Sequence, residues 1–186
     1  MVFVARMVRA ARLDPSLYEE VEADRRATGQ AAGVVVLSGV AAGIGALAWG
    51  GLQAVAVGVV GAVGGWLIWA LLTYAIGVKL FPEPETRSDL GELFRTIGFA
   101  SAPGVVRVLG LIPGARDGVF LVAAVWMLVA MVVAVRQALD YRSTSRALGV
   151  CALGWLIQAV VFVFLLRAQG IDPTQMGREP IGTSTP

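Results

Sequence analysis

The sequence predicts an all-α fold, a polytopic bundle of transmembrane helices with five spans and with interfacial amphipathic helices at the N-terminus and in mid-chain. Its 186 residues are 57% hydrophobic and only 15% charged, whereas soluble domains carry about 25% charge. The apolar residues also form uninterrupted runs long enough to cross the roughly 30 Å hydrocarbon core of a bilayer, instead of the half-polar periodicities of soluble folds.

The pattern of residues 1–13 predicts an amphipathic helix as the first element. Arg6, Arg9 and Arg12 recur at intervals of three on one side of the helix wheel, and apolar side chains occupy the other side. Such a helix is expected to lie flat on an anionic leaflet, with its arginines at the lipid phosphates and its apolar face in the acyl boundary. In the alternative, this helix packs against the body of the protein itself.

A short charged helix completes a cytoplasmic leader of residues 1–30. Asp14 supplies an N-cap, Pro15 suits the first helical position, and Gly29 closes the helix. The five acidic residues of the leader balance its five arginines. Because the leader is not a polybasic tail, nucleic-acid binding is not expected.

Two long uncharged runs come next, residues 31–49 and 54–78, and a four-residue connection joins them. Each run can cross the bilayer, so together they predict a tight antiparallel hairpin. Small residues one helical turn apart let helix backbones approach closely in lipid. The hairpin has two such pairs, Gly39 with Gly43 and Gly61 with Gly65, which we expect to serve helix packing, within the hairpin or in a dimer.

A polar interlude, residues 79–96, leads into a second amphipathic helix, whose apolar face lies over residues 90–97. In the next stretch, residues 97–112, Gly98 and Pro103 break the helical pattern and Arg107 interrupts the apolar run. This stretch is either a broken transmembrane helix or a re-entrant element, because its 16 residues are few for a span.

Two clearer spans, residues 119–135 and 147–166, complete a transmembrane domain of residues 31–166, and residues 167–186 are expected to be a flexible tail. Gln158, in the last span, is expected to hydrogen-bond a neighbouring helix.

Arginine counts predict the orientation. In a five-span arrangement, 11 basic residues lie on the side of the N-terminus and three on the other side. This asymmetry predicts an integral protein of the cytoplasmic (inner) membrane with its N-terminus in the cytoplasm and its C-terminus outside. The re-entrant alternative gives the same count, but the three arginines of the short loop at residues 136–146 favour five spans.

The chain lacks the residues that membrane enzymes and ion-coupled transporters use. It has no His, and its single Cys151 lies in an apolar run, so metal sites built from imidazole or several thiolates are excluded. No acidic residue lies within an expected span, and no nucleophile there has a base in register. We therefore expect no catalytic residue, no metal and no cofactor, and a small transporter is the least favoured interpretation.

Arg107 is the only ionised side chain deep in an apolar segment, where a central charge costs about 2.5–3.5 kcal/mol. Two interpretations stay open. Either Arg107 holds a lipid phosphate or a partner's carboxylate beside the break at Pro103, or it snorkels to the interface from a short helix.

The stretch GELFRTIGFASAPGVVRVLGLIPG, the apolar span with Trp126 and the segment VRQALDYRSTSRALGV resemble the Yip family of membrane proteins, in particular its short prokaryotic members. The opening RAARLDPSLYEEVEADRRATGQA is similar to the leader of such proteins, so the resemblance covers nearly the whole chain. In the eukaryotic branch it implies five helices, a cytoplasmic N-terminus and contacts with Rab-type GTPases in vesicle trafficking. The Asp-Leu-Tyr-Gly-Pro motif of that branch has no counterpart here, and GTPase binding is therefore doubtful.

These observations favour a non-enzymatic membrane scaffold or organising protein that acts through lipid and helix–helix contacts. Its expected partners are membrane lipids with anionic headgroups, and other membrane proteins or further copies of the same chain. In the alternative, the protein is an accessory subunit of a larger membrane protein complex.

Overall fold

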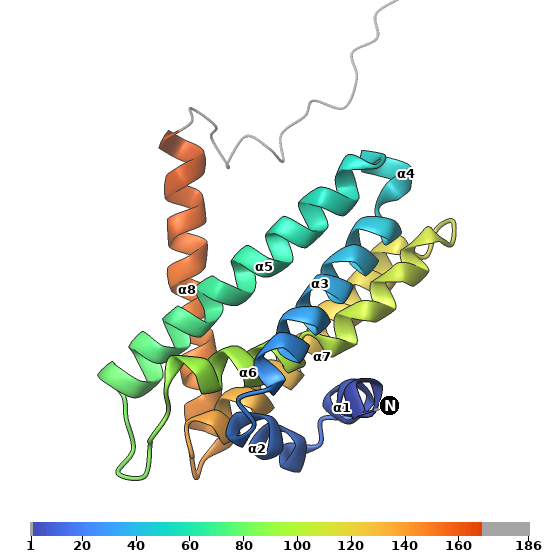
Figure 1. Ribbon diagram of the computed structural model, residues 1–186. Helices are drawn as coiled ribbons and strands as arrows, with labels where there is room; N and C mark the ends of the chain where they lie inside the picture. The colour runs from blue at the N-terminus through green and yellow to red at the C-terminus, as the bar shows by residue number, and fades with distance from the viewer. Residues whose placement is uncertain (1, 169–186) are drawn as a thin grey trace, which may run out of the picture.

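The computed structural model describes residues 2–168, and within them every regular element is a helix, which confirms the all-α prediction (Figure 1). Residues 169–186, most of the expected tail, lie outside the described residues. The π-helix η1 continues α5, and η2 is a 3₁₀ helix. The elements are α1 (Val2–Ala11), α2 (Pro15–Ala23), α3 (Ala27–Gly45), α4 (Leu47–Gly50), α5 (Gln53–Thr73), η1 (Tyr74–Leu80), α6 (Leu90–Ala100), η2 (Ala102–Leu111), α7 (Arg116–Ala138) and α8 (Thr144–Ala168).

Four helical stretches of the described chain are long and apolar enough to cross a membrane. They are α3, α5 together with η1, α7, and Thr144–Val161 of α8. These stretches overlap four of the five expected spans, although α3 ends at Gly45 and the last residues of the first expected span belong to α4. The remaining stretch, residues 97–112, is divided between α6 and η2, so neither of these helices has the length of a span by itself.

The expected hairpin is present, with α3 and α5 as its arms and α4 at its tip (Figure 1). The two backbones approach closely at glycines of α3. A Cβ atom on Gly39 would lie 2.8 Å from the Cα of Val59, and one on Gly43 would lie 2.3 Å from the Cα of Val55. No larger residue fits at either position without displacing α5. The order of these contacts also shows that the arms are antiparallel.

The segment from α6 through η2 runs alongside α3 in the same direction. Three contacts define the alignment: Gly98 with Ala31, Gly104 with Ser38, and Gly110 with Gly45. Between the first and last contact α3 rises roughly 21 Å. The end of α6 and η2 together cover a similar distance in fewer residues, because a 3₁₀ helix rises about 2.0 Å per residue. The segment therefore carries the chain to the α4 end of the bundle, where Arg116 lies 5.3 Å from the centre of the Trp49 ring.

The leader and the turn between α7 and α8 lie together at the opposite end. Gln137, near the end of α7, donates a hydrogen bond to Glu19 of α2 at 2.8 Å, and Thr86 donates one to the carbonyl of Leu139 at 2.9 Å. The chain thus enters α3 and leaves α7 at the same end of the bundle. Passes along α3, α5 and α7 alone would have left it at the other end, so the α6–η2 segment supplies the additional pass.

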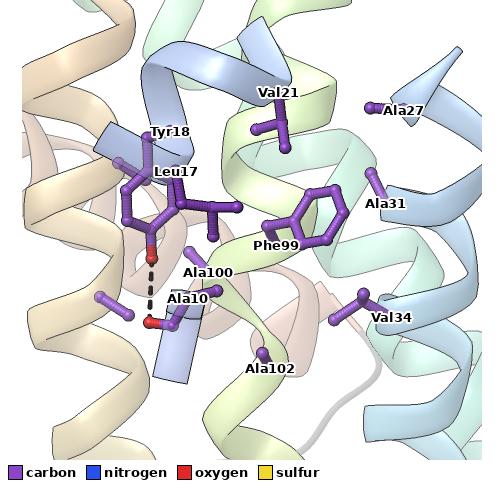
Figure 2. Packing of buried hydrophobic residues seen from close by; sticks show 12 residues of the cluster. Ala10, Leu17, Tyr18, Val21, Ala27, Ala31, Val34, Phe99, Ala100 and Ala102 are labelled. Carbon is purple, nitrogen blue, oxygen red and sulfur yellow. Dashed lines mark hydrogen bonds between the residues drawn. The ribbon is translucent and has the colours of Figure 1, made fainter. Parts of the chain in front are cut away.

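The leader belongs to the hydrophobic core. Leu17, Tyr18 and Val21 of α2 are fully buried and pack with Ala10 of α1 and Phe99 of α6 (Figure 2). The Tyr18 hydroxyl donates a hydrogen bond to the Ala10 carbonyl at 3.4 Å (Figure 2). Since burial of a large apolar side chain contributes about 1.5–3 kcal/mol, packing alone holds α2 firmly on the bundle.

We predict that Gly43→Leu destabilises the protein by about 1–3 kcal/mol, because the new side chain collides with the α5 backbone. Cys151 is only 2% exposed, so a thiol-reactive fluorophore reports thermal unfolding of the purified protein in detergent. The matched control is Gly64→Leu on α5, where a Cβ atom would have no neighbour within 4 Å. Equal melting temperatures for the two variants would contradict the role given to Gly43.

Candidate functional site

Arg6 of α1 is buried and points at the acidic side of α2. Its Nε donates a hydrogen bond to Glu20 at 2.8 Å, its Nη2 to Asp24 at 3.0 Å, and its Nη1 to the amide oxygen of Gln30 at 3.0 Å. Every nitrogen of the guanidinium is therefore bonded to the protein. Charge-assisted bonds of this kind are roughly twice as strong as neutral ones, so Arg6 fastens α1 to α2 and to the start of α3.

Arg9 extends the same network. It pairs with Asp14 at 2.7 Å and also with Glu20. Hydrogen bonds from Arg9 hold the pKa values of Asp14 and Glu20 below their usual range, as a bond from Arg6 does for Asp24. Arg12, which follows the end of α1, is exposed, and no carboxylate within residues 2–168 forms an ion pair with it.

The outward side of α1 is apolar. Val2, Val4 and Val8 are 61%, 62% and 43% exposed. On its inner side Phe3 lies close to Gly33, six residues into α3, which places this part of α1 roughly 9 Å along the bundle from the start of α3. Arg6 and Arg9 thus contact carboxylates of the protein, as in the alternative in which the N-terminal helix packs against the body of the protein. The valines of α1 face away from the bundle.

Arg95 of α6 makes a contact that no sequence pattern indicated. It is 6% exposed, and its Nε donates hydrogen bonds to the carbonyls of Val21 at 2.9 Å and of Glu22 at 3.1 Å. These carbonyls belong to the last turn of α2, where helix carbonyls lack partners and a cation is favourable. Burial, together with nearby Glu92 and Asp140, raises the pKa of the Glu22 carboxyl to about 7.

An apolar cavity of about 460 Å³ lies among α3, α5, α6, η2, α7 and α8. Gly61 and Gly65 of α5 line it, and a Cβ atom on either would meet no described atom within 4 Å. This glycine pair therefore faces the cavity, whereas Gly39 and Gly43 contact the other arm of the hairpin. The aromatic and sulfur-containing part of the lining consists of Trp66, Trp69, Met127, Met131 and Trp155.

Among the described residues, Arg107 of η2 is the only charged one that lines this cavity. Its Nε donates a hydrogen bond to the Gly104 carbonyl at 3.1 Å, and its Nη2 donates one to the Ser38 hydroxyl at 2.7 Å. The same Nη2 lies 3.4 Å from the Met127 sulfur. All three partners are neutral, and no carboxylate of the described chain neutralises Arg107.

The break between α6 and η2 positions Arg107. A Cβ atom on Gly98 would lie 2.7 Å from the Cβ of Ala31, so α6 ends in close contact with α3. Pro103 then lies in the first turn of η2, where its missing N–H is not needed.

Gln158, the remaining residue expected in helix contacts, is exposed on α8, and no hydrogen bond from its side chain occurs in the described part of the chain.

We predict that Arg6→Gln loosens the leader, because Glu20 and Asp24 lose their shared cation. Amide hydrogen exchange of α1 and α2 in the full-length protein should accelerate by at least about tenfold, the effect of losing roughly 1.4 kcal/mol of local stability. Arg12→Gln is the control and should leave exchange unchanged, since Arg12 is exposed and has no ion pair among the described residues. Identical exchange in the two variants would show that Arg6 does not fasten the leader.

Comparison with known proteins identifies the chain. A family model described as the Yip1 domain matches residues 16–166, which include α2, the hairpin, α6, η2, α7 and most of α8. Neither curated proteins nor solved structures give a match. The matched region contains all four helical stretches that are long and apolar enough to cross a membrane, as expected of an integral membrane protein. The chain belongs to the Yip1-domain family of membrane proteins.

Proposed function

We propose that this protein is a non-catalytic membrane scaffold or organising protein that acts through lipid and helix–helix contacts. The observation that carries the proposal is the surface of α5. Only Ala70 and Thr73 of this 21-residue helix are buried. Its exposed face carries large apolar side chains: Val57, Val60, Leu67, Ile68 and Leu71. Such a face needs lipid tails or other helices around it.

The chemistry of the described residues supports the same proposal. Within residues 2–168 there is no group of three or more His, Cys, Asp or Glu residues that could hold a metal ion. The hydroxyl of Ser38 accepts a hydrogen bond from Arg107, the charged residue of the cavity. An arginine cannot act as a general base, so this hydroxyl is not activated as a nucleophile. The polar network of the leader joins α1 to α2 and has a structural use.

We also propose five membrane spans, with the N-terminus in the cytoplasm, the C-terminus outside, and the cytoplasmic (inner) membrane as the location. The pass that α6 and η2 make along α3 supports the fifth span. The distribution of basic residues supports the orientation, because a five-span arrangement would put 11 of them on the leader's side and three on the other.

Single-cysteine labelling from the two sides of the membrane tests this topology in a Cys151→Ala background. Ser16→Cys and Ser145→Cys should label from the cytoplasm only, and Asp117→Cys, at an exposed position in the first turn of α7, from outside only. Labelling of Ser16→Cys and Ser145→Cys from opposite sides would contradict five spans. The reverse pattern at all three positions would overturn the orientation and leave the five spans intact.

A second candidate function is that of an accessory subunit in a larger membrane complex. The exposed Gln158 favours it, because an amide on an apolar helix such as α8 gains most from a hydrogen bond to another helix. Its neighbours Trp155, Leu156 and Val160 are also more than half exposed. A partner helix on α8 would cover both kinds of side chain.

Mass spectrometry of the full chain purified in mild detergent discriminates the two functions. The scaffold proposal expects bound lipids and no stoichiometric protein partner. A stoichiometric membrane protein that is lost in Gln158→Leu, but not in Gln53→Leu at the start of α5, would instead establish the accessory subunit. Consumption of a substrate by the purified protein would contradict both.

A further inference from the structure

The cavity beside Arg107 has the length of an acyl chain. Along α5 its lining extends from Val57 to Trp69, which is roughly 18 Å at 1.5 Å per residue. Opposite α5 stand methionines of α7 and Trp155 of α8. The volume of about 460 Å³ falls within the range of 300–1,000 Å³ that is usual for small-molecule sites.

The Arg107 side chain extends from the α4 end of the bundle toward its middle. Its backbone lies at Gly45, the last residue of α3, because a Cβ atom on Gly45 would contact the Arg107 carbonyl. Its guanidinium bonds Ser38, roughly 10 Å farther from that end along α3. A snorkelling arginine reaches toward the nearest interface, and Arg107 extends in the opposite direction.

The guanidinium keeps hydrogen-bonding capacity for an anion. Arginine has five N–H donors, and the contacts with Gly104, Ser38 and Met127 use only Nε and Nη2. Within residues 2–168, Nη1 has no hydrogen-bond partner. Within the four spanning stretches the one acidic residue is Asp117, in the first turn of α7 and roughly 15 Å along that helix from Met127, so these stretches of a second copy have no carboxylate at this depth. Among the described residues nothing supplies a counter-ion, so Arg107 is open to an anion from another molecule.

The cavity can be reached from the side of the bundle. Two residues of its lining are exposed at the surface of the bundle, Val57 of α5 at 70% and Trp155 of α8 at 52%. In a membrane, this flank of the protein faces lipid tails. An amphiphile can therefore enter laterally without passing through water.

From these observations we infer that the cavity binds an amphiphile with an anionic head and an acyl chain, with the head at Arg107 and the chain along α5. The inference rests on the proposed function, since it names one of the lipid contacts by which the protein acts. A phospholipid phosphate and a fatty-acid carboxylate share the required chemistry, because either can accept hydrogen bonds from the free N–H groups of an arginine.

Tryptophan quenching tests this site directly. In the double variant Trp49→Phe/Trp126→Phe, the three remaining tryptophans, Trp66, Trp69 and Trp155, all line the cavity. This full-length protein is reconstituted in phosphatidylcholine vesicles, to which dibrominated phosphatidylglycerol, dibrominated phosphatidylcholine or dibrominated stearate is added. We expect at least one anionic probe to quench at about tenfold lower mole fraction than brominated phosphatidylcholine, and the comparison of the two anionic probes identifies the head.

Variants locate the effect. Arg107→Gln should abolish the preference for the anionic probe, and Arg107→Lys should keep most of it. Arg116→Gln, a charge at the α4 end that is not in the cavity lining, should leave the preference unchanged. Gly65→Leu should weaken quenching by filling the cavity, whereas Gly64→Leu, on the same helix and outside the lining, should not. The Gly65 variant keeps the test decisive if Arg107→Gln fails to fold.

Equal quenching by anionic and zwitterionic probes would overturn the inference, and so would a preference that survives both Arg107→Gln and Gly65→Leu. A copurifying membrane protein that is lost in Arg107→Gln would also overturn it, by showing that a partner's carboxylate is the counter-ion. Failure of the quenching test without any substrate turnover or stoichiometric partner would leave the proposed scaffold function standing.

Discussion

The close approach of α3 to its neighbours is the contact on which the other helices depend. In lipid, helices gain little from hydrophobic burial, so they associate through van der Waals contact at small residues. Gly39 and Gly43 bring α3 against α5, and Gly45 brings it against η2. The opposing elements contribute Gly58, Gly98, Gly104 and Gly110 to the same contacts. Helix α3 is thus the central element of the bundle, and its glycines determine where α5, α6 and η2 can lie.

The sequence predicted much of this fold because length and hydropathy are local properties. The runs at residues 31–49 and 54–78 became the arms of the hairpin, with a tip that contains the short helix α4. The division of residues 97–112 next to Pro103 was also foreseeable, since proline disfavours the interior of a regular helix. The break expected at Gly98 was wrong, because α6 continues through Gly98 to Ala100 and this glycine instead lets α6 contact Ala31 of α3. The path of the chain beyond Pro103 was not foreseeable. The choice between a span and a re-entrant element depends on which helix the segment packs against, and only the alignment of η2 with α3 shows this.

The leader shows a different limit of sequence patterns. A helix wheel places Arg6 and Arg9 on one face but does not say what that face meets. A signal was present in α2 and its C-cap, where Glu20 and Asp24 are four residues apart and flank the face that carries Leu17 and Val21. Two helices with opposite charges and a short connection can neutralise each other. The arginines then stabilise the leader, and the valines of α1 are left for the surroundings.

The charge of Arg107 and the cavity beside it have a common origin in η2. A 3₁₀ helix covers the depth of the bundle with fewer residues than an α-helix, but its hydrogen bonds are poorer and it forms only short pieces. It therefore needs close support, which α3 and α7 supply on two sides. Glycine contacts hold α5 against α3. Space therefore remains between α5 and α7, and Arg107 of η2 lines this space. Because a bare charge in such a space is unfavourable, the same packing that completes the bundle also creates a place for an anion.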